Sequence, residues 1–450
     1  MQKKLLTLAV AGALAAPCIA MGQGSGPPTA AVEVYGTINM AFGKFKYDGA
    51  ANTTLFPDVS KWDVAQGASN YGLRGRESLG GGLTAWFQIE QNAPMERSNN
   101  VAITPASRNS AVGIQGGWGN LFMGQWTTPW ADLDSLWAVG TVGFWGPVTS
   151  IIGRRETTGT APNPNCDNYQ SSGGITLSTI AGGGYHPPCD AVKAGGGVGH
   201  AFWRRASQAV VYQSPVFSGA QFKVLYQTNE SKATVPTAAD PSLISTSLEW
   251  AGMGGRARIG AALDRHKDFT SPGKTDTGWA IKGGYNFGVV DVGLAYESMT
   301  YRAIFSDCKT SNYGVALAVP VGQGAIRASY AKAKAITGTF GPNPGLPAGT
   351  LWGAQVCGAT NVAGTGGAGQ PAATPNDGNT GAKMYDLGYE HRFSKRTTVG
   401  VGYAKIKNDP GAVFTWTGAP PTSDGSGVPA NTPGPGQSPS TYFVSMTHRF

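Results

Sequence analysis

Segments of about ten residues in which apolar and polar residues alternate recur along the whole chain. In "VEVYGTINMAF" (32–42), Val34 and Phe42 fall on one face, whereas Thr37 falls on the other. The stretch that ends at Phe450, "TYFVSMTHRF", alternates in the same way. A period of two residues is typical of β-strands with one apolar face, so the pattern predicts an all-β fold.

The apolar faces of these strands must be hidden from water, and the composition indicates how. Beyond the N-terminal segment no run of about 18 apolar residues occurs, so the sequence predicts no membrane-spanning helix. Charged residues make up 13% of the chain, aromatic residues 10%, and 67 residues are glycine. A secreted soluble β-protein remains one interpretation. Low charge, many tight turns and many aromatic rings favour the other, a β-barrel in a membrane.

The N-terminal segment has the features of a secretory signal. Lys3 and Lys4 precede the apolar run "LLTLAVAGALAA", and small residues follow. The run is too short for a membrane anchor. We therefore expect a signal peptide over residues 1–22 and a mature domain over residues 23–450.

Sixteen of the alternating segments are predicted as strands. Short turns and long segments rich in Gly and Pro alternate between them, as expected for a transmembrane barrel with all its short turns at one end. An even number of strands agrees with an antiparallel barrel, and about sixteen leave a water-filled interior. The predicted strands lie near 31–44, 68–77, 82–92, 107–116, 120–127, 204–214, 220–230, 243–252, 256–268, 277–287, 289–303, 311–321, 325–337, 382–393, 397–408 and 440–450.

The stretch up to Phe450 is expected to close this barrel. In lipid every backbone N–H and C=O group must be paired, so the sheet cannot leave a free edge. We therefore predict that the last strand pairs with the first. Tyr35, Tyr285, Tyr389 and Phe450 are candidates for the aromatic girdles at the membrane boundary.

Four cysteines follow the signal segment: Cys166, Cys189, Cys308 and Cys357. An even number in an exported chain predicts disulfides, and three pairings are open. The most local one joins Cys166 to Cys189 and Cys308 to Cys357. Because no C-x-x-C spacing occurs, the sequence predicts neither a metal site nor a cofactor.

Several motifs in order carry a resemblance to a known family. They are "VEVYGTIN", "SNYGLRGRESLGGGLTAWFQIE", "RNSAVGIQGGWGNLFMGQWTTPW", "RASQAVVYQSPVFSGAQFKVLY", "SKRTTVGVGYAKIKN" and the terminal "THRF". With them the chain resembles the Gram-negative general porin superfamily, most closely the Gly-rich porins of β-proteobacteria of the Burkholderiales type. Two positions depart from the family pattern. Asn70 stands where the family often has a basic residue, and Gly124–Gln125–Trp126 stands where the family often has G-R-Q/N.

The resemblance implies a homotrimeric channel in the outer membrane. It implies that the third loop, here about 128–203, folds into the interior and narrows it. It also implies that the outer-membrane assembly machinery reads the strand that ends at Phe450. An enzymatic activity is not expected, because no motif surrounds any of the five His residues. A nucleic-acid partner is not expected either.

The candidate selectivity residues are charges near the narrowed region. Asp132 and Asp134 lie on the third loop, and Arg205 falls on the family's R-x-x-N position. Acid on the loop facing base on the wall predicts a transverse field. The formal net charge of +8 includes the two signal lysines, so the mature chain carries +6, which favours small anionic or polar solutes. The cationic candidates are Arg74, Arg76, Arg108, Arg154, Arg155, Arg204 and Arg205.

Two alternatives to a general diffusion channel remain open at this point. A channel for particular solutes, such as aromatic acids, is one, because tryptophans gather at both ends of the third loop and could line a ring-stacking path. Packing of these rings against the wall is the alternative reading of the same residues. A structural or adhesive surface barrel is the other function class. The tryptophans are Trp126, Trp130, Trp137, Trp145 and Trp203.

Overall fold

The computed structural model describes most of the expected strands and the first part of the third loop. The described residues are 31–50, 53–54, 56–93, 95, 105–152, 202–228, 242–268, 273–302, 306–340, 380–410, 412, 414–416, 433 and 436–450. They form one antiparallel sheet of 18 strands. The strands are β1 (Ala31–Asp48), β2 (Val59–Gln66), β3 (Asn70–Gly80), β4 (Leu83–Asn92), β5 (Ser110–Gly116), β6 (Gly119–Thr127), β7 (Arg205–Gln213), β8 (Ala220–Gln227), β9 (Ser242–Gly252), β10 (Ala257–Lys267), β11 (Thr275–Asn286), β12 (Asp291–Arg302), β13 (Ser306–Val321), β14 (Gly324–Ala333), β15 (Thr337–Phe340), β16 (Ala382–Arg392), β17 (Thr397–Asn408) and β18 (Ser438–Arg449).

These strands form sixteen lines around a closed ring. The strands β2 and β3 pair one after the other with β1, so together they form one line. Likewise, β15 pairs with the start of β13 and β14 pairs with its end. The predicted 16-stranded antiparallel barrel is therefore confirmed. The prediction was wrong in one detail, because it began the second strand near residue 68 and missed β2.

The ring closes where the sequence predicted. β1 pairs with β18 in an antiparallel register in which Thr37 lies opposite Arg449. Beyond it, the Gly36 N–H donates to the Phe450 carbonyl at 3.3 Å, and the Phe450 N–H donates to the Gly36 carbonyl at 3.1 Å. The backbone groups of the two edge strands are thus paired, as a hydrocarbon environment requires.

The two faces of the ring have opposite character. On β10, Ile259 and Leu263 are more than half exposed on the outside, whereas Ala262, Asp264 and His266 are buried on the inside. A soluble protein buries its apolar side chains, so this inverted pattern fits a barrel with lipid outside and polar contents inside. None of the helices among the described residues is long and apolar enough to span a membrane.

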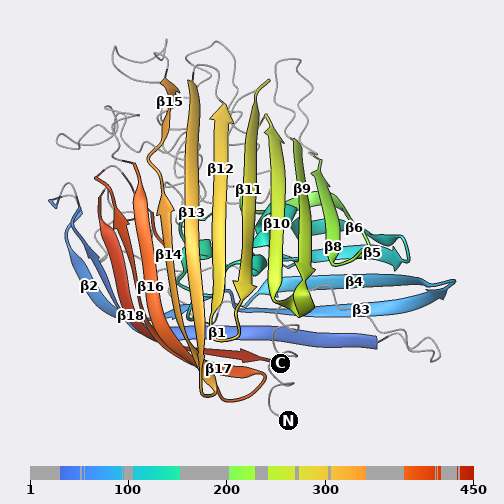
Figure 1. The fold of residues 1–450 in the computed structure, drawn as a ribbon, viewed down its shortest axis with the longest axis horizontal. Helices are drawn as coiled ribbons and strands as arrows, with labels where there is room; N and C mark the ends of the chain where they lie inside the picture. Colours follow the sequence, from blue (N-terminus) through green and yellow to red (C-terminus); the bar gives the residue numbers. More distant parts are fainter. Residues whose placement is uncertain are drawn as a thin grey trace.

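The two ends of the barrel carry different connections. Figure 1 shows the turns after β9, β11 and β13 at the same end as the C-terminus. Because neighbouring strands are antiparallel, the connections alternate between the two ends. The long connections, such as those after β6 and β17, lie at the other end, which also carries the short connection between Arg302 of β12 and Ser306 of β13. Short helices add to the connections: α2 (Pro129–Asp132), η1 (Leu133–Leu136), η2 (Pro147–Thr149) and η3 (Met253–Gly255). The predicted signal peptide, residues 1–22, lies outside the described residues.

Candidate functional site

The first part of the third loop, residues 128–152, lies against the inner face of the ring; we call it the inner segment. Its base is fixed where the Thr128 N–H donates to the Arg204 carbonyl at 3.1 Å. From there α2 packs on β8 to β10, and η1 packs on β10 and β11. Further along, Trp137 lies against the inner face of β12 and β13, and Val142 lies against the inner face of β16 and β17. The segment thus follows more than half of the wall.

Close approach to the wall requires glycine at one strand position in particular. A Cβ atom added to Gly293 on β12 would lie 1.8 Å from the Trp137 carbonyl oxygen. Only a residue without a side chain leaves room for the backbone of the inner segment at this point.

Two lysines on the wall bind the carboxylates of the inner segment. Lys282 on β11 places its Nζ atom 2.7 Å from Asp134 Oδ1 and 3.4 Å from Glu297 Oε2. Lys223 on β8 places its Nζ atom 3.2 Å from Asp132 Oδ2. The predicted acidic pair is therefore joined to strands behind the segment. Whether either carboxylate contributes to a field across the interior stays a prediction.

Two arginines hold the backbone of the same segment. Arg258 on β10 donates from Nε to the Leu136 carbonyl at 2.7 Å, and its Nη2 lies 2.6 Å from Asp291 Oδ1. Arg327 on β14 donates to the Val139 carbonyl and pairs with Glu390 at 3.3 Å. A buried carbonyl costs free energy unless it accepts a hydrogen bond, so these contacts favour the docked position.

The tryptophans of the third loop pack rather than line an open path. Trp130, Trp137 and Trp145 are fully buried, and Trp126 is 6% exposed. The ring of Trp145 contacts Phe443 with centroids 4.8 Å apart. Packing against the wall is thus confirmed for these four residues.

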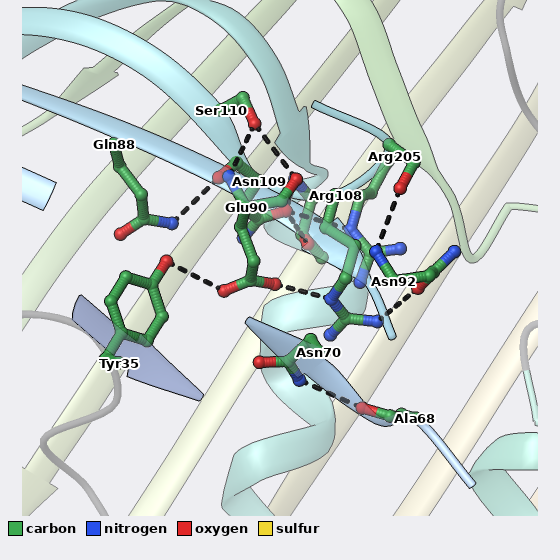
Figure 2. A network of polar contacts seen from close by, with 12 residues as sticks. Tyr35, Ala68, Asn70, Gln88, Glu90, Asn92, Arg108, Asn109, Ser110 and Arg205 are labelled. Atoms are coloured by element: carbon green, nitrogen blue, oxygen red, sulfur yellow. Dashed lines mark hydrogen bonds and ion pairs between the residues drawn. The ribbon is translucent and has the colours of Figure 1, made fainter. Parts of the chain in front are cut away.

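A second group of charges lies on the opposite side of the ring, on the inner face of β1, β3 and β4 and beside β5 and β7. The Tyr35 hydroxyl donates to Glu90 Oε2 at 3.0 Å, and Arg108 Nε lies 2.5 Å from Glu90 Oε1 (Figure 2). Arg205 Nε donates to Asn109 Oδ1 at 2.9 Å. These contacts bring together residues from four lines of the barrel, those of β1, β4, β5 and β7.

The same wall carries another arginine beside this network. Arg74 Nε lies 2.8 Å from Glu33 Oε2, and its guanidinium stands 4.7 Å from the centre of the Tyr35 ring. The interior position of Tyr35 shows that its assignment to the outer aromatic girdle was wrong. Its spacing of two residues from Glu33 was the signal that it shares the inner face.

The remaining predicted site residues fall into two groups. Arg204 is buried at the base of the inner segment. Arg76 lies in the half of β3 that is nearer to the short turn between β3 and β4. Arg154, Arg155, Cys166, Cys189 and Cys357 lie outside the described residues. Cys308 belongs to β13, opposite Tyr301, but its predicted partner is not described. The disulfides stay a prediction.

Two groups of the third loop have shifted pKa values. Burial raises the pKa of Asp132 to about 6, while the Lys223 ammonium group acts in the opposite direction and the Glu249 carboxylate adds to the rise. Burial lowers the pKa of Arg204 to about 10. Both shifts arise because burial disfavours a charge.

Comparison with known proteins identifies the family. The profile of the Gram-negative porin family matches residues 7–411. This chain belongs to the Gram-negative porins. It is similar to an outer-membrane porin protein of Bordetella pertussis, with 26% identity over 86% of this chain and 91% of that protein. Outer membrane porin protein 32 of Delftia acidovorans is 24% identical over 74% of this chain and 80% of that protein.

Solved structures show the same fold. The anion-selective porin from Comamonas acidovorans matches with a TM-score of 0.58 at 19% identity, covering 94% of this chain and all of that one. OmpT of Vibrio cholerae matches with a TM-score of 0.53 at 13% identity, covering 95% of this chain and 99% of that one. The family match and the outer-membrane relatives identify this porin as an outer-membrane channel protein, and the predicted localisation is confirmed.

Proposed function

We propose that this porin lets small hydrophilic solutes diffuse through an aperture between the inner segment and the opposite wall, with a preference for anions and carboxylates. The wall charges carry the preference. Arg74 pairs with Glu33, and Arg108 pairs with Glu90. The third arginine, Arg205, donates to the neutral side chain of Asn109. This wall therefore keeps a positive excess.

The side of the inner segment has the opposite balance. There, the cations Lys223, Lys282, Arg258 and Arg327 are each within ion-pair distance of a carboxylate, and two of them contact two. Lys282, Glu297 and Arg258 have at most 3% of their side chains exposed, so they act on the position of the segment more than on a passing solute. On the arginine wall, the side chain of Arg74 is 30% exposed and can attract a passing anion.

The expected attraction is moderate. A carboxylate about 8 Å from one wall arginine would gain roughly 2 kcal/mol at an effective dielectric near 20. Energies of this size select a solute without trapping it. Salt should weaken the preference, because the screening length is about 8 Å at physiological ionic strength. The anion selectivity named for the Comamonas acidovorans porin is consistent with this proposal.

Reversal potentials across a planar bilayer in a KCl gradient test the proposal. The wild-type channel should favour chloride, and the triple variant with Arg74, Arg108 and Arg205 replaced by Gln should favour it less. The matched control is Lys395→Gln, in the exposed turn that follows β16, and it should leave the reversal potential unchanged. A cation-selective wild-type channel would refute the preference.

The other function classes are separated by simple measurements. A channel built for aromatic acids loses support because four of the five tryptophans that would line it are buried. A structural or adhesive barrel predicts no open-channel steps in a bilayer, whereas a diffusion channel predicts them. A homotrimer, proposed from the family, predicts slow electrophoretic migration of the unheated protein that heating converts to the monomer position.

A further inference from the structure

Three lysines stand opposite one another on the outer face of the barrel. Lys332 on β14 is the register partner of Lys383 on β16, and Lys383 is the partner of Lys407 on β17. Adjacent strands lie about 4.8 Å apart, so the row spans about 10 Å. The three side chains point outward, because the alternating neighbours Ala331 and Met384 are buried inside.

Such a row is unfavourable unless something neutralises it. Like charges directly opposite one another destabilise a sheet. Asp409, just after β17, is a neighbouring carboxylate; burial raises its pKa, and the three lysines act against that rise. One carboxylate cannot neutralise three ammonium groups. The outward-facing Lys405, two residues before Lys407, adds further positive charge.

Tyrosines form a second row next to the lysines. Tyr330 is the register partner of Tyr385. The rings of Tyr385 and Tyr403 have centroids 6.4 Å apart, and those of Tyr403 and Tyr442 are 4.5 Å apart. Aromatic rings with a polar edge gather where hydrocarbon meets water, so this row marks the membrane boundary.

Aliphatic side chains follow on the far side of the tyrosines. Leu387, Val401 and Val444 are 58%, 48% and 49% exposed on the same outer face. The order along the strands is therefore aliphatic, aromatic, basic. The lysine row lies at the end of the barrel that carries the long connections, which in an outer-membrane porin is the cell-surface end.

We propose that Lys332, Lys383 and Lys407 bind the phosphate groups of an anionic lipid in the outer leaflet, with the acyl chains against the tyrosine and aliphatic rows. A lysine near the hydrocarbon edge extends its ammonium group toward the headgroups, where phosphates lie. Three donors on adjacent strands match a headgroup with more than one phosphate. The proposal depends on the outer-membrane location and not on the ion selectivity proposed above.

The expected affinity change follows from the charge. Each basic residue near an anionic membrane surface contributes about 1 kcal/mol, and 1.4 kcal/mol is a factor of ten. Replacing all three lysines by Gln should therefore weaken binding about 100-fold.

The experiment is a titration of the mature porin in a neutral detergent with bisphosphorylated lipid A, followed by native mass spectrometry. The triple variant K332Q/K383Q/K407Q should lose the bound lipid, whereas K332R/K383R/K407R should keep it. The matched control replaces Lys395 and Arg396, exposed basic residues at the other end of the barrel, by Gln, and should keep the lipid. Unchanged open-channel conductance shows that each variant folds.

Three results would overturn the proposal. The first is equal binding by the wild type and the triple Gln variant. The second is equal binding of lipid A and its dephosphorylated form, which would indicate acyl-chain contact alone. The third is displacement of lipid A by inorganic phosphate that binds as tightly as lipid A does, which would indicate a site for free anions.

Discussion

Lys282 on β11 fastens Asp134 of the inner segment to the wall: its Nζ atom lies 2.7 Å from Asp134 Oδ1. The lysine side chain has no exposed surface, and its second partner Glu297 has none either. A buried ammonium group between two carboxylates can hold a loop only while all three charges remain.

Replacing Lys282 should therefore release the inner segment. In Lys282→Met the two carboxylates lose their counter-charge, which costs about 3–5 kcal/mol for a buried pair. We expect larger and noisier single-channel currents in a planar bilayer. Adding Asp134→Asn and Glu297→Gln to the same variant should restore quieter currents, because no unpaired charge is left. Currents like those of the wild type in Lys282→Met alone would contradict the role of this contact.

The docked state should depend on pH through Asp132. Burial raises the pKa of Asp132 to about 6, above the ordinary value of an aspartate, so the folded protein takes up the proton before the unfolded chain does. Stability from this group is then fully present below about pH 4 and is lost as the pH rises through 6. The unfolding midpoint of the porin in detergent should fall between pH 4 and pH 7. In Asp132→Asn this fall should be smaller, and an identical profile in both proteins would exclude Asp132 as its source.

The strands were predictable because the two environments of the barrel alternate with every residue. The same rule explains the missed strand β2. Trp62 and Val64 face outward there, and the charged residues Lys61 and Asp63 alternate with them. The inner face of a water-filled barrel accepts charged side chains. An alternation of apolar and charged residues therefore still indicates a strand.

The candidate site was predictable only in part. The position of the third loop and of Arg205 came from the resemblance, but the anchors Lys223 and Lys282 did not. Both lysines occupy inward positions of their strands, and that was the available signal. Which loop carboxylate each one meets depends on the path of the loop across strands remote in the sequence, and local periodicity contains no information about that path.

Glu90 should moderate the anion preference. It lies within 2.5 Å of Arg108 and accepts a hydrogen bond from Tyr35, so it offsets one wall arginine. In Glu90→Gln the preference for chloride should rise about twofold to fivefold, less than the unscreened energy of roughly 2 kcal/mol would give. Arg108→Gln should change the reversal potential in the opposite direction. If both variants shifted it the same way, their effect would be structural rather than electrostatic.

Gly293 tests whether the inner segment is held by close contact as well as by charge. A Cβ atom at this position would lie 1.8 Å from the Trp137 carbonyl oxygen, and Trp137 is fully buried. Gly293→Ala must therefore push the backbone of the segment away from β12, at a cost of about 1–3 kcal/mol for an overpacked site. We expect a lower unfolding temperature and an altered single-channel conductance. Gly117→Ala is the matched control, because a Cβ atom there meets no other atom within 4 Å. Equal conductance and stability in both variants would show that the segment does not lie against β12 in the working channel.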